Sequence, residues 1–315
     1  MYLPMTNKIS EKGFIPVMLT PFTETGAIDF NTLTRLTELY LQAGAAGLFA
    51  NCLSSEMFEL TEAERLQVIE HVIKVTNGRV PVVATGTFGG PIAQQADFVK
   101  QVADKGTDAV ILITGLLAEQ TDSNEVFNER VFQLLDQTAT VSVGFYECPV
   151  PYKRLISPEQ LKLFVDTGRV IYHKDTCLDI DQIREKLRLA NRPGFGLYDA
   201  YMVHAVESLK AGSAGLSCIQ GNFFPELIVW LCQNYNQADL QQEVGEVQQF
   251  LIDSMDVIHN VYPTVSKYFL QLRGFDISTY TRRDVGTFTP EIAKNVEGLL
   301  ADYSQLQEKL SLTVL

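Results

Sequence analysis

A short apolar segment followed by a longer amphipathic segment recurs eight times in the first 235 of the 315 residues of this chain. The apolar segments are rich in β-branched and aromatic residues, as strands are, and they lie at residues 14–20, 47–51, 80–85, 108–114, 141–146, 170–174, 194–197 and 215–219. The helical segments are expected at residues 31–43, from 61, 92–105, 124–137, from 157, 180–189, up to 210 and 225–234. Because strands that alternate with helices pair in parallel, this order predicts an α/β fold with a parallel sheet covered by helices.

The number of these units separates two parallel architectures. Eight strand-then-helix units close a (β/α)8 TIM barrel. The alternative, an open flavodoxin-like or Rossmann sheet, requires a glycine-rich phosphate loop after its first strand, whereas this chain has Thr20-Pro21-Phe22-Thr23 there. We therefore predict a closed TIM barrel.

The strand signals stop after the eighth unit. Helical patterns follow at residues 240–257, 265–272 and 290–310. Because no flexible linker precedes them, we expect residues 236–315 to form a C-terminal helical appendage packed on a barrel of residues 1–235.

The charge balance narrows the classes of partner. The chain has 25 Lys and Arg against 38 Asp and Glu, a formal net charge of −13, which gives a nucleic-acid role no electrostatic support and disfavours anionic membranes. No apolar run approaches the roughly 20 residues that span a bilayer, and the first 13 residues lack the apolar core of a signal peptide. Five cysteines without paired spacing are typical of free thiols, so we expect a cytoplasmic protein.

A lysine ends the sixth predicted strand, where TIM barrels carry their reactive groups. Lys174 follows the largely apolar run 170–173 and shares a strand face with Val170 and Tyr172. Burial in the barrel mouth would lower the pKa of its amine, and the neutral amine is the form that attacks a carbonyl. The alternative is an ion pair with Asp175 or another acid, and position alone leaves both interpretations open.

Two further groups lie at the ends of other predicted strands. Tyr146 ends the fifth strand and could relay protons, although a buried tyrosine more often only packs. Ser54 and Ser55 follow the second strand and could donate to a carboxylate, although such serines often only cap the next helix.

Four motifs in register resemble one known family. They are "TPF" at residues 20–22, "CLSSE" at 52–56 followed by "LTEAER", "YECP" at 146–149 and "HKD" at 173–175. Together they are similar to the dihydrodipicolinate synthase / N-acetylneuraminate lyase superfamily. The resemblance implies a barrel that forms an imine between its lysine and a 2-keto acid, usually as a homo-oligomer (a tetramer or dimer), without any cofactor.

The resemblance also implies roles for individual residues. Lys174 would form the imine and Tyr146 would relay protons. The remaining candidates are expected to bind substrate, and they are Leu53, Ser54, Ser55, Thr20, Glu147 and Ser217.

Several positions depart from the family pattern. The loop usually reads Gly-Thr/Ser-Thr-Gly-Glu, so Leu53 replaces a hydroxyl that often belongs to the proton relay. Glu147 occupies the usual asparagine position, Pro151 stands where the synthases carry a carboxylate-binding arginine, and 114–117 lacks their paired tyrosines. A divergent member is therefore expected rather than a true dihydrodipicolinate synthase.

Three functions remain open at this point. The first is a class I lyase that cleaves a 2-keto acid, pyruvate-type or a 2-keto-3-deoxy sugar acid, through Lys174. The second is a dehydratase of 2-keto-3-deoxy sugar acids that uses the same imine, and the third is a non-catalytic ligand-binding barrel. We expect no metal site, because the strand-end cysteines would have to converge on one ion to form it; they are Cys52, Cys148, Cys177 and Cys218.

Overall fold

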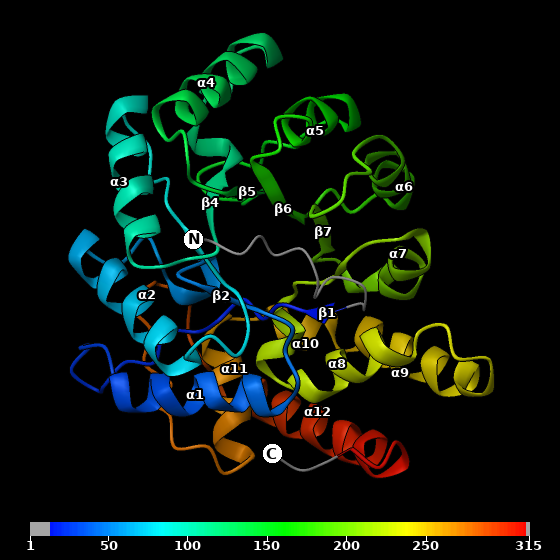
Figure 1. Ribbon diagram of the computed structural model, residues 1–315. Helices are drawn as coiled ribbons and strands as arrows, with labels where there is room; N and C mark the ends of the chain where they lie inside the picture. Colours follow the sequence, from blue (N-terminus) through cyan, green and yellow to red (C-terminus); the bar gives the residue numbers. More distant parts are fainter. Residues whose placement is uncertain (1–12, 313–315) are drawn as a thin grey trace.

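The computed structural model describes residues 13–312, and Figure 1 shows a ring of helices around a central sheet. All sheet neighbours pair in parallel, in the order β1-β8-β7-β6-β5-β4-β3-β2. The strands are β1 (Gly13–Phe14), β2 (Leu48–Ala50), β3 (Val82–Thr85), β4 (Ala109–Ile113), β5 (Val143–Tyr146), β6 (Val170–Asp175), β7 (Gly196–Asp199) and β8 (Gly215–Leu216). The predicted α/β barrel architecture is confirmed.

The ends of the sheet meet beside β2. The segment after β1 forms a parallel bridge between Val17 and Phe49. The Phe49 N–H donates to the Pro16 carbonyl at 3.0 Å, and the Met18 N–H donates to the Phe49 carbonyl at 3.1 Å. Regular pairing of β1 stops earlier than predicted because Pro16 has no N–H to donate.

Helices connect successive strands, and most of them begin at a polar cap. The barrel helices are α1 (Phe30–Gln42), α2 (Glu62–Thr76), α3 (Ile92–Asp104), α4 (Asn124–Gln137), α5 (Pro158–Val165), α6 (Ile180–Leu189), α7 (Ala205–Ala211) and α8 (Pro225–Asn234). Thr61 and Glu64 form a capping box at the predicted start of α2, with the Thr61 N–H donating to Glu64 Oε2 at 2.9 Å. The first helix begins one residue earlier than predicted, at Phe30, and Asp29 caps it by accepting the Thr32 N–H at 3.0 Å.

The C-terminal helices pack on the barrel beside α8. They are α9 (Gln241–Asp253), α10 (Met255–His259), α11 (Thr264–Leu272) and α12 (Pro290–Lys309). Phe224 stacks on Tyr303 with ring centroids 5.3 Å apart, and Phe269 packs edge-on against both rings. Among the described residues, none of the helices is long and apolar enough to cross a membrane.

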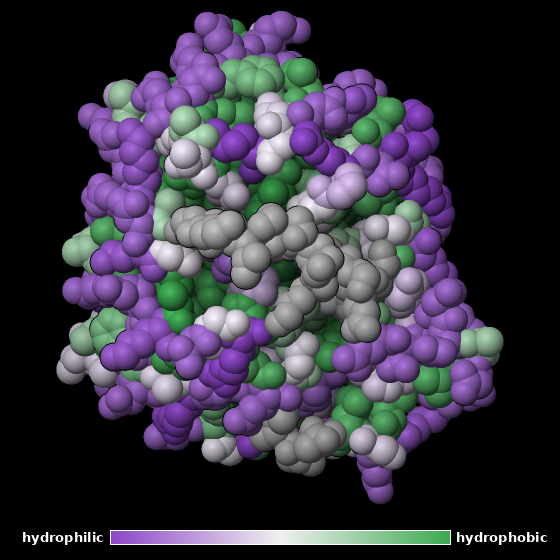
Figure 2. All heavy atoms as spheres, in the orientation of Figure 1, coloured by the Kyte–Doolittle hydropathy of each residue, from purple (hydrophilic) through white to green (hydrophobic). Residues whose placement is uncertain are grey.

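Aromatic side chains fill the inside of the barrel. Tyr172 stacks on Tyr198 at 4.9 Å, and Phe49 meets both Tyr146 and Tyr172 edge-on at 6.0 Å. This interior is a packed core rather than a pore, as is usual for eight-stranded barrels. In Figure 2 polar side chains dominate the edge of one face, and hydrophobic side chains appear nearer its centre.

Candidate active site

Lys174 lies next to Tyr146 inside the barrel. β5 and β6 are neighbours in the sheet, and their register pairs Tyr146 with Lys174. The Lys174 Nζ lies 4.0 Å from the centroid of the Tyr146 ring, and both side chains are 4% exposed. The structure thus brings together the amine and the phenol singled out in the sequence.

The environment of Lys174 favours a neutral amine. Burial lowers the pKa of Lys174, and the nearby Lys153 lowers it further, while the thiols of three cysteines act in the opposite direction. Those cysteines are Cys52, Cys148 and Cys218. Asp175, considered above as a partner, instead binds Lys186 Nζ at 2.7 Å.

Tyr146 is a protonated phenol at neutral pH. Burial raises the pKa of Tyr146 well above its usual value, and neighbouring Cys148, Cys52 and Tyr262 raise it further. A phenol of this kind donates a proton only to a strong base, such as the oxygen anion that forms when an amine adds to a carbonyl.

The loop after β2 contains two serines, Ser54 and Ser55, and their hydroxyl groups differ in their surroundings. Ser55 Oγ donates to the Met18 carbonyl at 2.6 Å and accepts the Cys52 N–H at 3.0 Å, so it stabilises the loop and has no proton left for a ligand. Ser54 is buried, with 5% of its surface exposed. Leu53 packs on the aromatic interior and offers no polar group.

Thr20, which follows β1, and Ser217, which follows β8, differ in whether their hydroxyl groups already have hydrogen-bond partners. Ser217 Oγ donates to the Ile15 carbonyl at 2.9 Å and meets the Tyr172 hydroxyl at 3.1 Å. Thr20 is fully buried, and its hydroxyl has no hydrogen-bond partner among residues 13–312. Of these two, Thr20 is the one with a hydroxyl available to a ligand.

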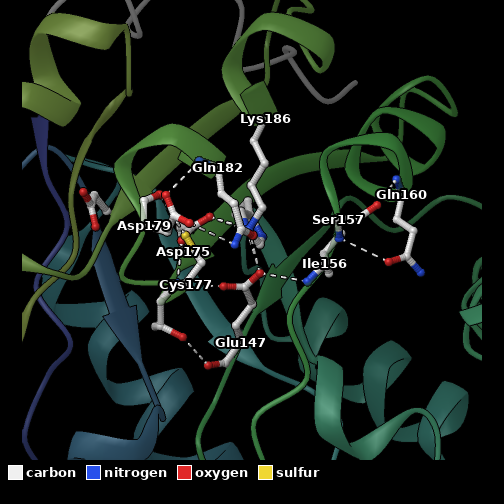
Figure 3. A network of polar contacts seen from close by, with 12 residues as sticks. Glu147, Ile156, Ser157, Gln160, Asp175, Cys177, Asp179, Gln182 and Lys186 are labelled. Carbon is white, nitrogen blue, oxygen red and sulfur yellow. Dashed lines mark hydrogen bonds and ion pairs between the residues drawn. The ribbon is translucent and has the colours of Figure 1, made fainter. Parts of the chain in front are cut away.

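Glu147 faces away from the barrel interior. Figure 3 shows its carboxylate between the strand ends and α6, where it accepts the N–H groups of Ile156 and Thr176, each at 2.9 Å, and Lys186 Nζ at 2.8 Å. These contacts favour a structural role for Glu147 over the predicted substrate contact.

Lys186 joins the residues that follow the two candidate catalytic groups. Its amine binds Glu147 next to Tyr146 and Asp175 next to Lys174, and all three charged side chains are fully buried. Burial alone would lower the pKa of Lys186, but the charges of Glu147 and Asp175 outweigh burial and raise it. The pKa of Asp175 is held well below its usual value, because a hydrogen bond from His173 and the charge of Lys186 overcome the effect of burial.

One group of potential metal ligands occurs in the described part of the chain, and it contains no cysteine. Glu147, His173 and Asp175 bring their ligand atoms within 4.8 Å of one another. The Lys186 amine lies 2.8 Å and 2.7 Å from the two carboxylates and supplies the positive charge at this position. The donor set therefore does not fit a metal ion.

A chain of polar side chains near the candidate site was not predicted from the sequence. The Tyr40 hydroxyl donates to Asn222 Oδ1 at 2.5 Å, and Asn222 Nδ2 donates to the Tyr262 oxygen at 2.6 Å. Tyr262 lies between α10 and α11, in the C-terminal helical region. The sequence-based search considered the carboxyl ends of the barrel strands, where such enzymes carry their reactive residues, and so did not include it.

The fold and the site define a class of protein. Reactive side chains at the carboxyl ends of strands in a (β/α)8 barrel are the arrangement found in barrel enzymes. The chain matches the model of the dihydrodipicolinate synthetase family over residues 10–302, and it belongs to that family.

Named relatives of the chain are lyases. A probable 2-dehydro-3-deoxy-D-pentonate aldolase, YjhH of Escherichia coli K12, is 22% identical over 91% of this chain and 96% of its own length. A putative 2-dehydro-3-deoxy-D-gluconate aldolase, YagE of the same strain, is 25% identical over 85% of this chain and 89% of its own length. The chain is accordingly an enzyme of the carbon–carbon lyase type, and the low identities mark it as a divergent member.

Solved structures share the same fold. The structure of YagE from E. coli K12 in complex with pyruvate superposes with a TM-score of 0.83 at 23% identity, covering 94% of this chain and 98% of that one. A monomeric dihydrodipicolinate synthase variant gives a TM-score of 0.85 at 20% identity, with coverage of 94% and 98%.

Proposed function

We propose that the chain is an aldolase that forms a Schiff base with a 2-keto acid through Lys174. The observation that carries this proposal is the buried Lys174 amine, with its lowered pKa, 4.0 Å from the Tyr146 ring. A neutral amine at the carboxyl end of a barrel strand is the nucleophile that imine chemistry needs.

The proposed reaction proceeds through an imine. The Lys174 amine adds to the C2 carbonyl of the keto acid, and loss of water gives the imine, whose nitrogen then accepts the electron pair of the breaking C3–C4 bond. An aldehyde leaves, and protonation of the enamine at C3 followed by hydrolysis releases pyruvate and the free amine. Tyr146 is proposed to give a proton to the C2 oxygen and later to exchange protons with the C4 hydroxyl.

The substrate class follows from the relatives. Two of them are named as aldolases of 2-dehydro-3-deoxy sugar acids, and one of these, YagE, was solved in complex with pyruvate. We infer a 2-keto-3-deoxy sugar acid as substrate and pyruvate as the shared product. Dehydration gains no support from Glu147, because the carboxylate of that residue is bound to Lys186.

We further infer a soluble, cytoplasmic homo-oligomer of the kind common in the family, a dimer or tetramer. Sedimentation velocity of the purified chain tests this assignment. A single monomeric species would contradict it, and one structural neighbour is itself described as a monomeric variant.

Reductive trapping tests the imine directly. The protein is incubated with pyruvate and sodium cyanoborohydride, and the intact mass and the peptide map are read. We expect one reduced pyruvate adduct, on Lys174. Lys174→Met should abolish the adduct, whereas Lys153→Met, which removes an exposed lysine from the same neighbourhood, should retain it.

Two results would overturn parts of this proposal. Absence of an adduct on the wild-type chain with every 2-keto acid tested would exclude the imine and favour a non-catalytic barrel. If the adduct forms, product analysis on 2-keto-3-deoxy sugar acids separates cleavage, which releases pyruvate and an aldehyde, from dehydration, which keeps the carbon chain intact.

A further inference from the structure

We propose that Glu56, at the end of the loop after β2, is a positioning residue whose carboxylate holds that loop in the shape that binds the keto acid. Its partners come from the C-terminal helical region, so the proposal gives that region a part in substrate binding. The proposal rests on the function inferred above, because it concerns how the same substrate is held.

The Glu56 carboxylate is surrounded by donors from the helical region. Lys267 Nζ donates to Oε1 at 3.1 Å, and the N–H groups of Arg282 and Arg283 donate to Oε2 at 2.6 Å and 2.9 Å. The same lysine amine also donates to the Tyr280 carbonyl at 2.7 Å. Glu56 and Lys267 are fully buried, so water does not compete for these bonds. They join the loop after β2 to the segment between α11 and α12.

Glu56 also closes a tight turn in that loop. Its N–H donates to the Leu53 carbonyl at 3.1 Å, at the end of the single 3-10 turn Leu53–Ser55. The backbone of Glu56 has φ 55° and ψ 40°, a left-handed conformation that is uncommon for a residue with a Cβ. A strained backbone of this kind persists only where surrounding contacts hold it. The three donors to the carboxylate are such contacts, so their loss should let the turn relax.

The turn borders the candidate catalytic pair. Cys52 belongs to the same buried hydrophobic cluster as Tyr146, and Leu53 packs against that cluster. Phe49, at the end of which strand the loop begins, meets the Tyr146 ring edge-on at 6.0 Å, and the Lys174 amine lies 4.0 Å from the centroid of the same ring. The shape of the turn therefore affects the space beside Lys174 in which a keto acid is held.

The partners of Glu56 hold the loop after β1 as well. The Lys267 amine and the Arg282 guanidinium lie 4.9 Å and 4.8 Å from the centroid of the Phe22 ring, where a cation is attracted to the ring face. Arg282 Nε donates to the Gly26 carbonyl at 3.0 Å. Phe22 closely follows Thr20, whose buried hydroxyl has no partner within the described part of the chain. One set of contacts thus fixes two loops that carry candidate substrate-binding residues.

The Arg282 side chain fastens this segment to α2. Its two terminal nitrogens donate to the Glu64 carboxylate at 2.9 Å and 2.7 Å, and the side chains are 21% and 25% exposed. Arg79 forms the same kind of fork with Glu38, at 2.8 Å and 2.6 Å, between α1 and the end of α2. Because the Arg79 fork does not contact Glu56 or its donors, Arg79 provides a matched control.

The concentration dependence of reductive trapping tests the proposal in the full-length protein. Arg282→Gln removes the fork but keeps the backbone N–H that binds Glu56. We expect the pyruvate concentration for half-maximal trapping to rise about fivefold, the effect of losing one partly exposed ion pair, with less than about a twofold change in the rate at saturation. Arg79→Gln should leave both quantities unchanged.

Glu56→Gln tests the positioning residue itself. This substitution keeps the shape of the side chain and removes its charge, so we expect a rise of about tenfold in the half-maximal pyruvate concentration, the effect of losing a hydrogen bond to a charged group. Circular dichroism under the trapping conditions checks that the variant is folded. An unfolded fraction would lower the amount of adduct at saturation, whereas loss of positioning raises the concentration that is needed to reach it.

The outcomes distinguish the proposal from the function on which it rests. If the wild type forms no adduct with pyruvate or any other 2-keto acid, both fail. If the wild type is trapped and Glu56→Gln has the same half-maximal pyruvate concentration, only the positioning role is overturned. An equal rise in Arg282→Gln and Arg79→Gln, or a lower rate at saturation with an unchanged half-maximal concentration, would also overturn it.

Discussion

Replacement of Lys186 by methionine should strongly destabilise the fold. The Lys186 amine is the positive partner of two carboxylates, at 2.8 Å from Glu147 and 2.7 Å from Asp175, and none of the three side chains is exposed. Methionine has a similar length and no charge, so the substitution leaves a small cavity but two negative charges without their partner. Breaking a buried ion pair costs about 3–5 kcal/mol, because the remaining charge stays desolvated.

The remaining contacts suggest a value within that range rather than above it. Glu147 keeps the N–H groups of Ile156 and Thr176, and Asp175 keeps the Cys177 N–H at 2.8 Å. These dipoles offset part of the lost charge. We expect urea unfolding followed by circular dichroism at pH 8 to give a loss of about 4 kcal/mol in the free energy of unfolding.

The same substitution at an exposed ion pair is the control. Lys162 pairs with Asp166, and these side chains are 48% and 57% exposed. Because water screens such a pair, Lys162→Met should cost no more than about 0.5 kcal/mol. An equal effect of the two substitutions would refute the reasoning from burial.

The pH dependence of the free energy of unfolding shows whether the two unpaired carboxylates cause the loss of stability in Lys186→Met. In the wild type the pKa of Asp175 is depressed, so its contribution is present above the unfolded-state pKa of about 4 and stays constant from pH 5 to 8. In Lys186→Met the unpaired buried charges should hold a proton that the unfolded chain releases, so the stability of the variant falls as pH rises. The difference between the proteins should grow by up to about 1.4 kcal/mol per pH unit and proton, and a flat difference from pH 5 to 8 would contradict this account.

Three further predictions concern the site and its support. Because burial lowers the pKa of Lys174, the rate of pyruvate trapping should rise with pH and level off below the usual lysine pKa of 10.5; a midpoint at or above that value would contradict the argument. Tyr146→Phe should reduce the turnover of a cleavable substrate by about 10²–10⁴-fold while the Lys174 adduct can still be trapped, and unchanged turnover would exclude the proton relay. In the wild type the fully buried Lys267 amine lies 3.1 Å from Glu56. Glu56→Gln leaves this amine without its negative partner, so urea unfolding should show a loss of about 3 kcal/mol in the free energy of unfolding. A loss below about 1 kcal/mol would argue against this ion pair as a link between the barrel and the helical region.

The barrel and the pairing of its two candidate groups were predictable because they depend on local patterns. Apolar runs, the Thr61 capping box and the proline at the start of α5 are each read within a few residues of sequence. Strand order follows once the units are counted, and it brings Tyr146 and Lys174 to adjacent positions. The start of α1 was misplaced because Asp29 and Asn31 are both good caps, and local sequence does not choose between them.

The direction in which the Glu147 side chain points, and the contact between Tyr262 and Asn222, could not be predicted from local patterns. A glutamate after a strand can point into the barrel or toward the helices, and the outcome depends on Lys186, whose own position depends on how α6 packs. Tyr262 reaches Asn222 only because α10 and α11 fold back on the barrel. Both contacts join segments far apart in the sequence, and no short motif records them.

The opposite faces of β5 and β6 explain how a neutral lysine can lie beside two carboxylates. Glu147 and Asp175 directly follow Tyr146 and Lys174, and their negative charges would favour the protonated form of Lys174 if they were unpaired. Lys186 supplies a compensating charge on the outer face, so burial dominates the pKa of Lys174 on the inner face.

The thiols around Lys174 support the same conclusion. Only a thiolate would hold a proton on the lysine, and burial raises the pKa of Cys52 and Cys148, and that of Cys218 to about 12. At neutral pH all three are uncharged, so their pull on the Lys174 proton is absent. The inner face is then an apolar environment with polarisable neutral groups, in which an amine loses its proton more readily than in water. The chemistry proposed for Lys174 therefore depends on a charge balance on the outer face and on neutral thiols on the inner one.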